Sequence, residues 1–212
     1  GDVDAAEEWM RKILPEVTDK LVGVLRPDFG IEAEILLARG QVDAGLRMWR
    51  STTLQVQGPD MIIDPYLEAW VLEAESVTVV AHSRHGRVEL VADTADALPA
   101  KLLALLPGKF PVVSGTIMHD PIRGVVLAAI AMADLARHGG DPAVARRAVR
   151  MIALAERMRF LRSFQPTMSP AGISAAARDA DGPAYDEAVS SYAGLSPEAL
   201  RERAAALLAE RA

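Results

Sequence analysis

Four arginines in one segment have the residue type and the spacing that binding chemistry would need: Arg146, Arg147, Arg150 and Arg157. The guanidinium group is a permanent cation that pairs with carboxylates through a planar fork of hydrogen bonds. At about 100° per residue, Arg146, Arg150 and Arg157 share one helix face within about 40°, and Arg147 lies beside it. The segment is therefore a candidate surface for an acidic partner. The alternative is a solvated face that binds nothing, as is usual for charge stripes on helices.

The charge of the chain favours a protein partner over a nucleic acid. The net charge is −6, and it is unevenly spread: residues 1–75 hold 7 basic and 15 acidic side chains, whereas residues 76–165 hold 12 and 7. An acidic chain lacks the electrostatic footprint of a stand-alone DNA-binding domain. We expect a protein partner, or another domain of the same parent chain, and no direct contact with nucleic acid. The uneven charge could steer such a partner, but ordinary clustering of charge on a normal surface is the preferred explanation.

Two histidines have the spacing of metal ligands, but no further ligand lies near them in the sequence. His82 and His85 are three residues apart, which can bring two imidazoles together on a helix. A catalytic zinc site uses three protein ligands, and no Asp or Glu lies close by in the sequence. Polar or cationic side chains also suit the last turn of a helix, where we expect these two to lie. We therefore predict no metal site.

We find no set of residues that could act together as nucleophile, base and orienting group. The run Pro107-Gly108-Lys109 does not match a phosphate-binding loop, because Phe110-Pro111 follows it instead of Ser or Thr and a helix. Glu73 and Glu75 are two apart and point to different helix faces. We predict a protein that is not an enzyme and that uses no cofactor. The alternative is a small-molecule-binding domain or an enzyme with a cleft near residues 107–120, with His119 and Asp120 beside it.

Signals for helix starts and stops recur along the whole chain. A capping side chain precedes proline five times, at residues 64–65, 120–121, 141–142, 169–170 and 196–197. Such a side chain accepts a hydrogen bond from a free N–H, and proline at the first helical position has no N–H to leave unpaired. Glycines that could supply a left-handed residue after a last turn are Gly40, Gly86, Gly139, Gly140, Gly182 and Gly194. We find no strict alternation long enough for a confident strand, so the prediction is an all-α protein.

A weak repeat indicates how these helices are organised. Helix, glycine and helix recur around Gly40, Gly86 and Gly139, which predicts stacked antiparallel helix-turn-helix units, similar to tetratricopeptide repeats, in an α-solenoid. The chain is expected to be one domain, with a possible seam at 107–119 between repeats in 1–106 and in 120–212. The expected helices are 4–26, 31–39, 41–56, 64–84, 87–106, 120–138, 142–160, 170–180, 183–193 and 197–211.

Composition adds expectations about burial and environment. Half of the residues are apolar, and there is no cysteine, which fits a cytoplasmic protein. The longest apolar run, Gly124–Ala133, cannot span a bilayer that requires about 20 residues, so we expect a helix buried on all sides and no membrane partner. Trp9, Trp49 and Trp70 fall on apolar stripes and are expected in the core. The chain begins Gly-Asp-Val without Met, and we expect it to be part of a longer protein.

Three runs in the second half resemble a known family: Asp120–Ala129, Ile152–Ser169 and Tyr192–Ala204. They look like the C-terminal end of the actinobacterial antibiotic-regulatory activators that carry a bacterial transcriptional activation domain. The resemblance covers residues 31–210 and is strongest over 120–210. It implies a tetratricopeptide-like region that acts as a sensing or regulatory surface in signalling to transcription. This chain has no winged-helix pattern and no Walker motif, so the resemblance places DNA binding and ATP hydrolysis in other domains of the parent protein.

Overall fold

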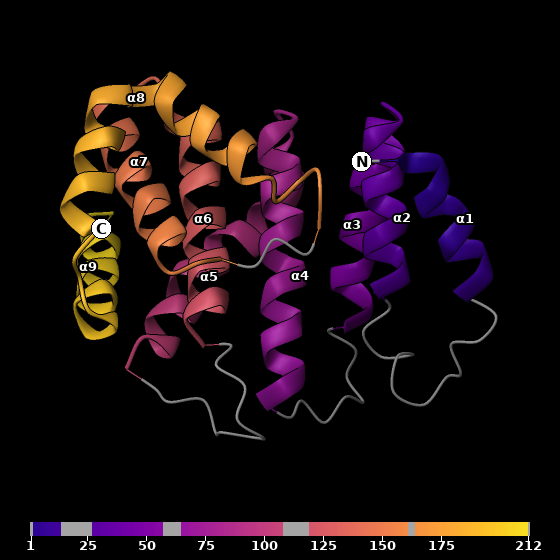
Figure 1. The fold of residues 1–212 in the computed structure, drawn as a ribbon, viewed down its shortest axis with the longest axis horizontal. Helices are drawn as coiled ribbons and strands as arrows, with labels where there is room; N and C mark the ends of the chain where they lie inside the picture. Colours follow the sequence, from indigo (N-terminus) through magenta and orange to yellow (C-terminus); the bar gives the residue numbers. More distant parts are fainter. Residues whose placement is uncertain (1, 14–26, 57–64, 108–118, 161–163, 212) are drawn as a thin grey trace.

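The computed structural model describes residues 2–13, 27–56, 65–107, 119–160 and 164–211 (Figure 1). Within these ranges the chain is helical and contains no strand, which confirms the predicted all-α class. The helices are α1 (Val3–Ile13), α2 (Pro27–Ala38), α3 (Val42–Val56), α4 (Pro65–Arg84), α5 (Ala92–Leu105), α6 (His119–His138), α7 (Pro142–Arg157), α8 (Pro170–Tyr192) and α9 (Pro197–Ala209), with a 3₁₀ turn η2 (Val88–Val91) before α5. The second helix begins at Pro27, four residues earlier than the sequence predicts.

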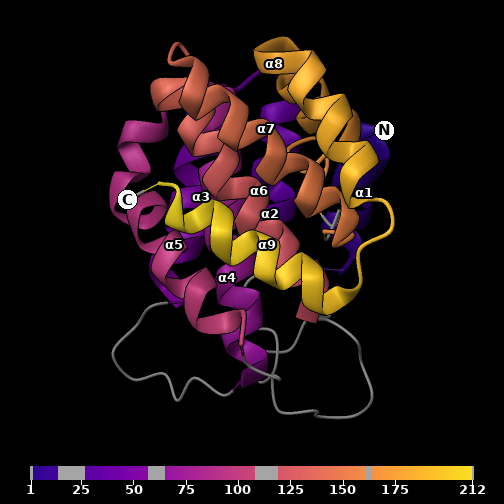
Figure 2. The same cartoon turned by 90° about the vertical axis from the view of Figure 1, so that its left-hand side faces the viewer.

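Most helices pack beside their neighbours in sequence. Helices α1 to α4 lie side by side in chain order, α4 packs on α6, α6 on α7, and α7 on α8 (Figure 1). Helix α9 departs from this order, because it turns back and lies across α5 and α7 (Figure 2). The seam that we predict at residues 107–119 falls almost entirely outside the described residues, and it stays a prediction.

Helix α6 is the centre of the core. Its residues from Ile122 to Ala133 are all buried, as we predict for the longest apolar run. Gly124 permits the close approach of α6 to the end of α7, because a Cβ atom there would lie 3.0 Å from the Ala155 carbonyl oxygen. The small side chains of α6 and α7 thus let the two helices pack tightly.

The capping side chains follow the predicted pattern at three helix starts. Asp141 accepts a hydrogen bond from the N–H of Ala143, Ser169 from that of Gly172, and Ser196 from that of Ala199. Asp120 is not a cap, and this prediction is wrong. Helix α6 already begins at His119, and the Asp120 carboxylate pairs with Arg123 instead. Asp64 lies outside the described residues.

The prediction of glycines with left-handed backbone conformation is only partly correct. Gly40 and Gly86 have φ values of +75° and +64°, as the sequence predicts, whereas Gly139, Gly140, Gly182 and Gly194 do not adopt positive φ. After α7, Arg159 takes that conformation with φ 57°, so the helix ends at Arg157 rather than at residue 160.

The two helices that we predict at 170–180 and 183–193 form one helix with a kink. Asp181 at the kink is non-helical, with φ −159° and ψ 81°, and Pro183 follows it. The Asp181 carboxylate accepts a hydrogen bond from the N–H of Ala184 and so caps the second half of α8.

One of the three tryptophans is in the core, and the prediction is wrong for the other two. Trp49 is fully buried, whereas Trp9 is 67% exposed and Trp70 is 40% exposed. Helix α1 packs on α2 at the edge of the molecule, so its outer face meets no helix of the described chain. Trp70 lies near the N-terminal end of α4, which extends past its neighbours in Figure 1.

A buried carboxylate joins the N-terminal helices to the C-terminal half. Glu34 on α2 accepts hydrogen bonds from the Trp49 indole N–H (3.2 Å) and from the backbone N–H of Thr167 (2.9 Å). The Phe164 ring packs edge-on against Trp49, with 4.9 Å between the ring centroids. Gly30 leaves room for this contact, since a Cβ there would lie 2.7 Å from a Phe164 ring carbon. This junction connects segments 133 residues apart.

The junction is stabilised by hydrogen bonds, yet the charge at its centre is unfavourable. Burial raises the pKa of the Glu34 carboxyl, and the hydrogen bonds from Thr167 and Trp49 oppose this rise without cancelling it. A carboxyl whose pKa is raised by folding binds its proton more tightly in the folded state. Its contribution to stability is therefore lost as pH rises from the ordinary value of 4.5 through the raised pKa.

We predict that Glu34→Gln removes this pH dependence. The free energy of unfolding of the wild type, relative to that of Glu34→Gln, should fall as pH rises from about 4.5 to 7, because only the wild type ionises at this site. Urea denaturation at a series of pH values measures the difference. Glu34→Ala, which leaves two buried N–H donors unpaired, should cost about 1–3 kcal/mol throughout. A constant difference between the wild type and Glu34→Gln across this range would contradict the assignment.

Candidate functional site

Helix α7 has one buried face and one arginine face. Its small and apolar side chains pack into the core: Ala145, Ala148, Val149, Met151, Ile152, Ala153, Leu154 and Ala155. The four arginines that we predict as an interaction surface lie on the remaining face, and the structure divides them into two pairs. Arg146 and Arg150 line a pocket, whereas Arg147 and Arg157 hold neighbouring helices in place.

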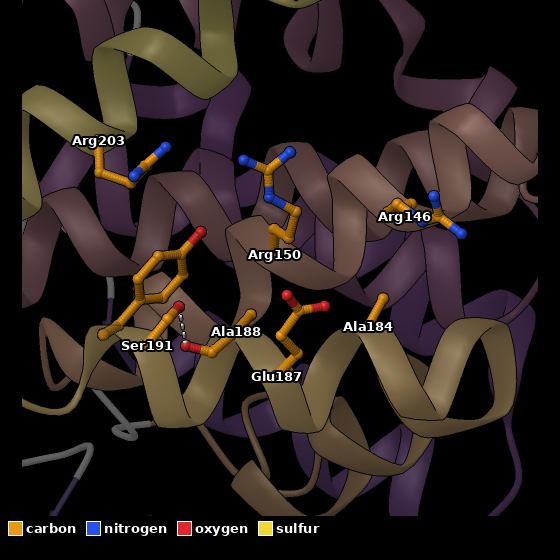
Figure 3. A pocket seen from close by; sticks show the side chains of 8 residues that line it. Arg146, Arg150, Ala184, Glu187, Ala188, Ser191 and Arg203 are labelled. Atoms are coloured by element: carbon orange, nitrogen blue, oxygen red, sulfur yellow. Dashed lines mark hydrogen bonds between the residues drawn. The ribbon is translucent and has the colours of Figure 1, made fainter.

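The pocket lies between α7, α8 and α9 and has a volume of about 280 Å³. We call it the arginine pocket. Its lining consists of Arg146 and Arg150 from α7, Ala184, Glu187, Ala188, Ser191 and Tyr192 from α8, and Arg203 from α9. Figure 3 shows the two α7 arginines on one side, Glu187 opposite them, and Arg203 on the third helix. Three arginines and one glutamate thus line one hollow.

The counter-ions within the molecule satisfy these arginines incompletely. Arg146 lies 3.6 Å from Asp181 and its side chain is 69% exposed, and Arg150 lies 3.3 Å from Glu210 with 29% exposure. Arg203 forms no ion pair or hydrogen bond with any part of the chain that the structure describes. The pocket therefore has positive charge available to a ligand, and a carboxylate is the group that guanidinium binds with two parallel hydrogen bonds.

Arg147 belongs to a separate cluster, the C-terminal clasp, which comprises Asp134, Arg147, Glu210 and Arg211. The Arg211 guanidinium donates two hydrogen bonds to the buried Asp134 carboxylate, at 2.9 and 2.7 Å. Arg147 lies 3.6 Å from the same carboxylate and donates a 3.0 Å hydrogen bond to the backbone carbonyl of Glu210. The clasp fastens the end of α9 to α6 and α7, and it turns Arg147 away from the pocket.

Arg157 and Tyr185 fix the position of α8. The Arg157 Nε donates a hydrogen bond to the carbonyl oxygen of Tyr192 in the last turn of α8, where a cation is favoured by the helix dipole. The Tyr185 hydroxyl donates to Glu156 at 2.6 Å, and burial raises the pKa of this phenol, which keeps it protonated. These contacts hold the wall of the arginine pocket that α8 supplies.

The sequence did not identify Arg203, Glu187 or Tyr192 as pocket residues. Each lies on a helix that packs against α7 through tertiary contacts, and a local sequence pattern does not predict such contacts. The two arginines that do line the pocket were found by helical periodicity, because Arg146 and Arg150 are four residues apart on one helix.

Of the other residues that we weighed for chemistry, His82 and Glu75 have structural partners. His82 is buried, and its Nδ1 shares a 2.8 Å hydrogen bond with the Thr78 carbonyl; burial lowers the pKa of this imidazole. His85 is exposed. Glu75 is buried and pairs with Lys101 at 2.6 Å. Among the described residues, no three His, Cys, Asp or Glu side chains form a group that could hold a metal ion.

The alternative cleft near residues 107–120 falls mostly outside the described part of the chain, including residues 108–118 and the side chain of His119. Asp120, at its edge, lies 2.8 Å from Arg123 and 3.7 Å from Arg201. The contact with Arg201 connects α6 to α9, whereas the contact with Arg123 lies within α6.

No protein-family model, no curated protein and no solved structure matches this chain. In the part of the chain that the structure describes, no helix has the length and apolar character needed to cross a membrane.

We predict that Asp134→Asn strongly destabilises the protein. The change would leave Arg147 and Arg211 without their buried counter-charge. Removing one partner of a buried ion pair costs about 3–5 kcal/mol, and we expect roughly 2–3 kcal/mol here because both arginines are partly exposed. Urea denaturation followed by circular dichroism measures the loss.

The matched control for this prediction is Glu198→Gln, which also removes a carboxylate that pairs with an arginine. Glu198 is exposed at 71%, and its pair with Arg201 is on the surface, so little change in stability is expected. Equal effects of the two substitutions would show that the clasp does not hold α9.

Proposed function

We propose that this helical domain is a non-catalytic binding module, and that the arginine pocket takes an acidic segment of a protein partner. The observation that carries the proposal is that three arginines from two helices line one hollow, with Arg203 lacking an internal counter-ion among the described residues. Guanidinium groups bind planar, negatively charged carboxylates in preference to uncharged or cationic groups. Glu187 adds one negative charge to the lining, so the pocket is positive without being uniformly basic.

A protein partner fits these features better than a nucleic acid does. The chain has a net charge of −6, which opposes the approach of a polyanion over most of the surface. A local cationic hollow of this size instead suits a few acidic side chains presented by a folded or extended segment. Arginine is also enriched in protein–protein interfaces.

The wider setting that we propose rests on the sequence resemblance. In this proposal the chain is the sensor or regulatory region of a larger bacterial transcriptional regulator in the cytoplasm. An α-solenoid of helix-turn-helix units in this region presents the pocket. The side-by-side packing of α1 to α4 in chain order supports a stack of this kind. Co-purification with the other domains of the parent protein tests the setting, and persistent failure of those domains to associate would count against it.

The binding proposal predicts a charge-selective interaction that depends on the pocket arginines. A fluorescein-labelled peptide of Glu, Asp and Ala should bind, and its Gln, Asn and Ala counterpart should not. The combined substitution of Arg146, Arg150 and Arg203 by Ala should weaken binding by about tenfold or more, since about 1.4 kcal/mol of lost interaction is tenfold in Kd. Fluorescence polarisation measures the affinity, which should fall as salt is raised.

The matched control replaces Arg11, Arg47 and Arg87 by Ala. These arginines are exposed and lie away from the pocket, and their loss changes the net charge by the same amount. Equal weakening by both triple variants would show a general charge effect and contradict the pocket assignment. Binding of free citrate or phosphate, with none of the peptide, would point to a small-anion site instead.

A further inference from the structure

Arg150 has the least exposed side chain of the three pocket arginines, and it already has an acidic partner from the same chain. Arg150 lines the arginine pocket, and its Nη1 lies 3.3 Å from the Glu210 carboxylate. Glu210 directly follows α9 and is not part of the pocket lining. A ligand carboxylate that is to pair fully with Arg150 must therefore compete with Glu210.

Glu210 is held in an electrostatic position that favours its release. It is the C-cap residue of α9, where the partial negative charge of the helix end disfavours a carboxylate. Its side chain is 45% exposed, so water can solvate the carboxylate once it leaves Arg150. Ion pairs between partly exposed groups are weak, which makes exchange for another carboxylate inexpensive in free energy.

The backbone of Glu210 is held independently of its carboxylate. Arg147 donates to the Glu210 carbonyl oxygen at 3.0 Å, and the neighbouring Arg211 forms the two hydrogen bonds with Asp134. Release of the side chain therefore does not require α9 to leave α7. Arg203, on the same helix, stays beside the pocket while Arg150 changes partner.

We propose that Glu210 is a built-in competitor of the acidic ligand, which occupies Arg150 until a ligand carboxylate replaces it. This inference rests on the proposed function, and it concerns the regulation of the same pocket. Glu210 sets a threshold: a segment with a single weakly placed carboxylate leaves the pair intact, whereas a segment that also engages Arg146 or Arg203 displaces it. The device thus selects ligands that carry more than one acidic group.

The test compares Glu210→Gln with the wild type in binding the fluorescein-labelled Glu, Asp and Ala peptide. Loss of the internal carboxylate should tighten binding about two- to fivefold, the size expected from competition with a partly exposed ion pair. In an Arg150→Ala background, Glu210→Gln should have no effect on affinity, because the contested group is gone. Glu202→Gln is the matched control, since it removes one exposed negative charge from α9 that is neither paired with Arg150 nor part of the pocket lining.

The outcomes separate this inference from the proposed function. If Glu210→Gln leaves the affinity unchanged, or if Glu202→Gln tightens binding equally, Glu210 is not a competitor of the ligand. The proposed binding at the arginine pocket would still stand. Binding by Glu210→Gln with none by the wild type supports the competitor at full strength. Failure of both proteins to bind the peptide overturns the proposed function and the competitor together. Circular dichroism of each variant confirms that α9 and the remaining helices are retained.

Discussion

The buried carboxylate of Asp134 is the constraint on which the candidate site depends. A carboxylate this deeply buried needs cationic partners, and it takes them from α7, through Arg147, and from the end of the chain, through Arg211. Two consequences follow for the site. Arg147 is turned away from Arg146 and Arg150, and α9 is drawn across α5 and α7 so that Arg203 reaches the pocket. The place of Arg203 beside the pocket therefore depends on the pairing of a single buried acidic group of α6.

A second buried carboxylate, that of Glu34, acts at the other end of the molecule. It joins α2 and α3 to the segment before α8, across 133 residues of sequence, while the Asp134 pair spans 77. Most other helix packing is between neighbours in the chain, and small residues such as those of α6 stabilise it by close apolar contact. Buried polar groups that must find partners thus add to the long-range order, whereas the stacking of neighbouring helices is driven by the burial of apolar surface.

The sequence predicts what is local and misses what is tertiary. Asp141, Ser169 and Ser196 cap helices as predicted because a cap involves only the next few residues. Trp9 was expected in the core, since a stripe on α1 cannot reveal whether another helix covers it. The arginine stripe was located correctly on α7, but its division into pocket and structural residues depends on Asp134 and on the carbonyl oxygen of Tyr192. The position of Arg203 beside the pocket could not be predicted, because the sequence of α9 does not show that this helix turns back across α7.

In the proposed binding mode the arginines differ in role: Arg146, Arg150 and Arg203 are available to a ligand, whereas Arg147 and Arg157 are bound within the fold. Their side-chain Nε–H resonances in a nitrogen–proton NMR spectrum report on each guanidinium separately. During titration with the acidic peptide, we expect saturable shifts for Arg146, Arg150 and Arg203, and unchanged resonances for Arg147 and Arg157. Shifts of similar size at all five arginines, or at none of them, would contradict this binding mode.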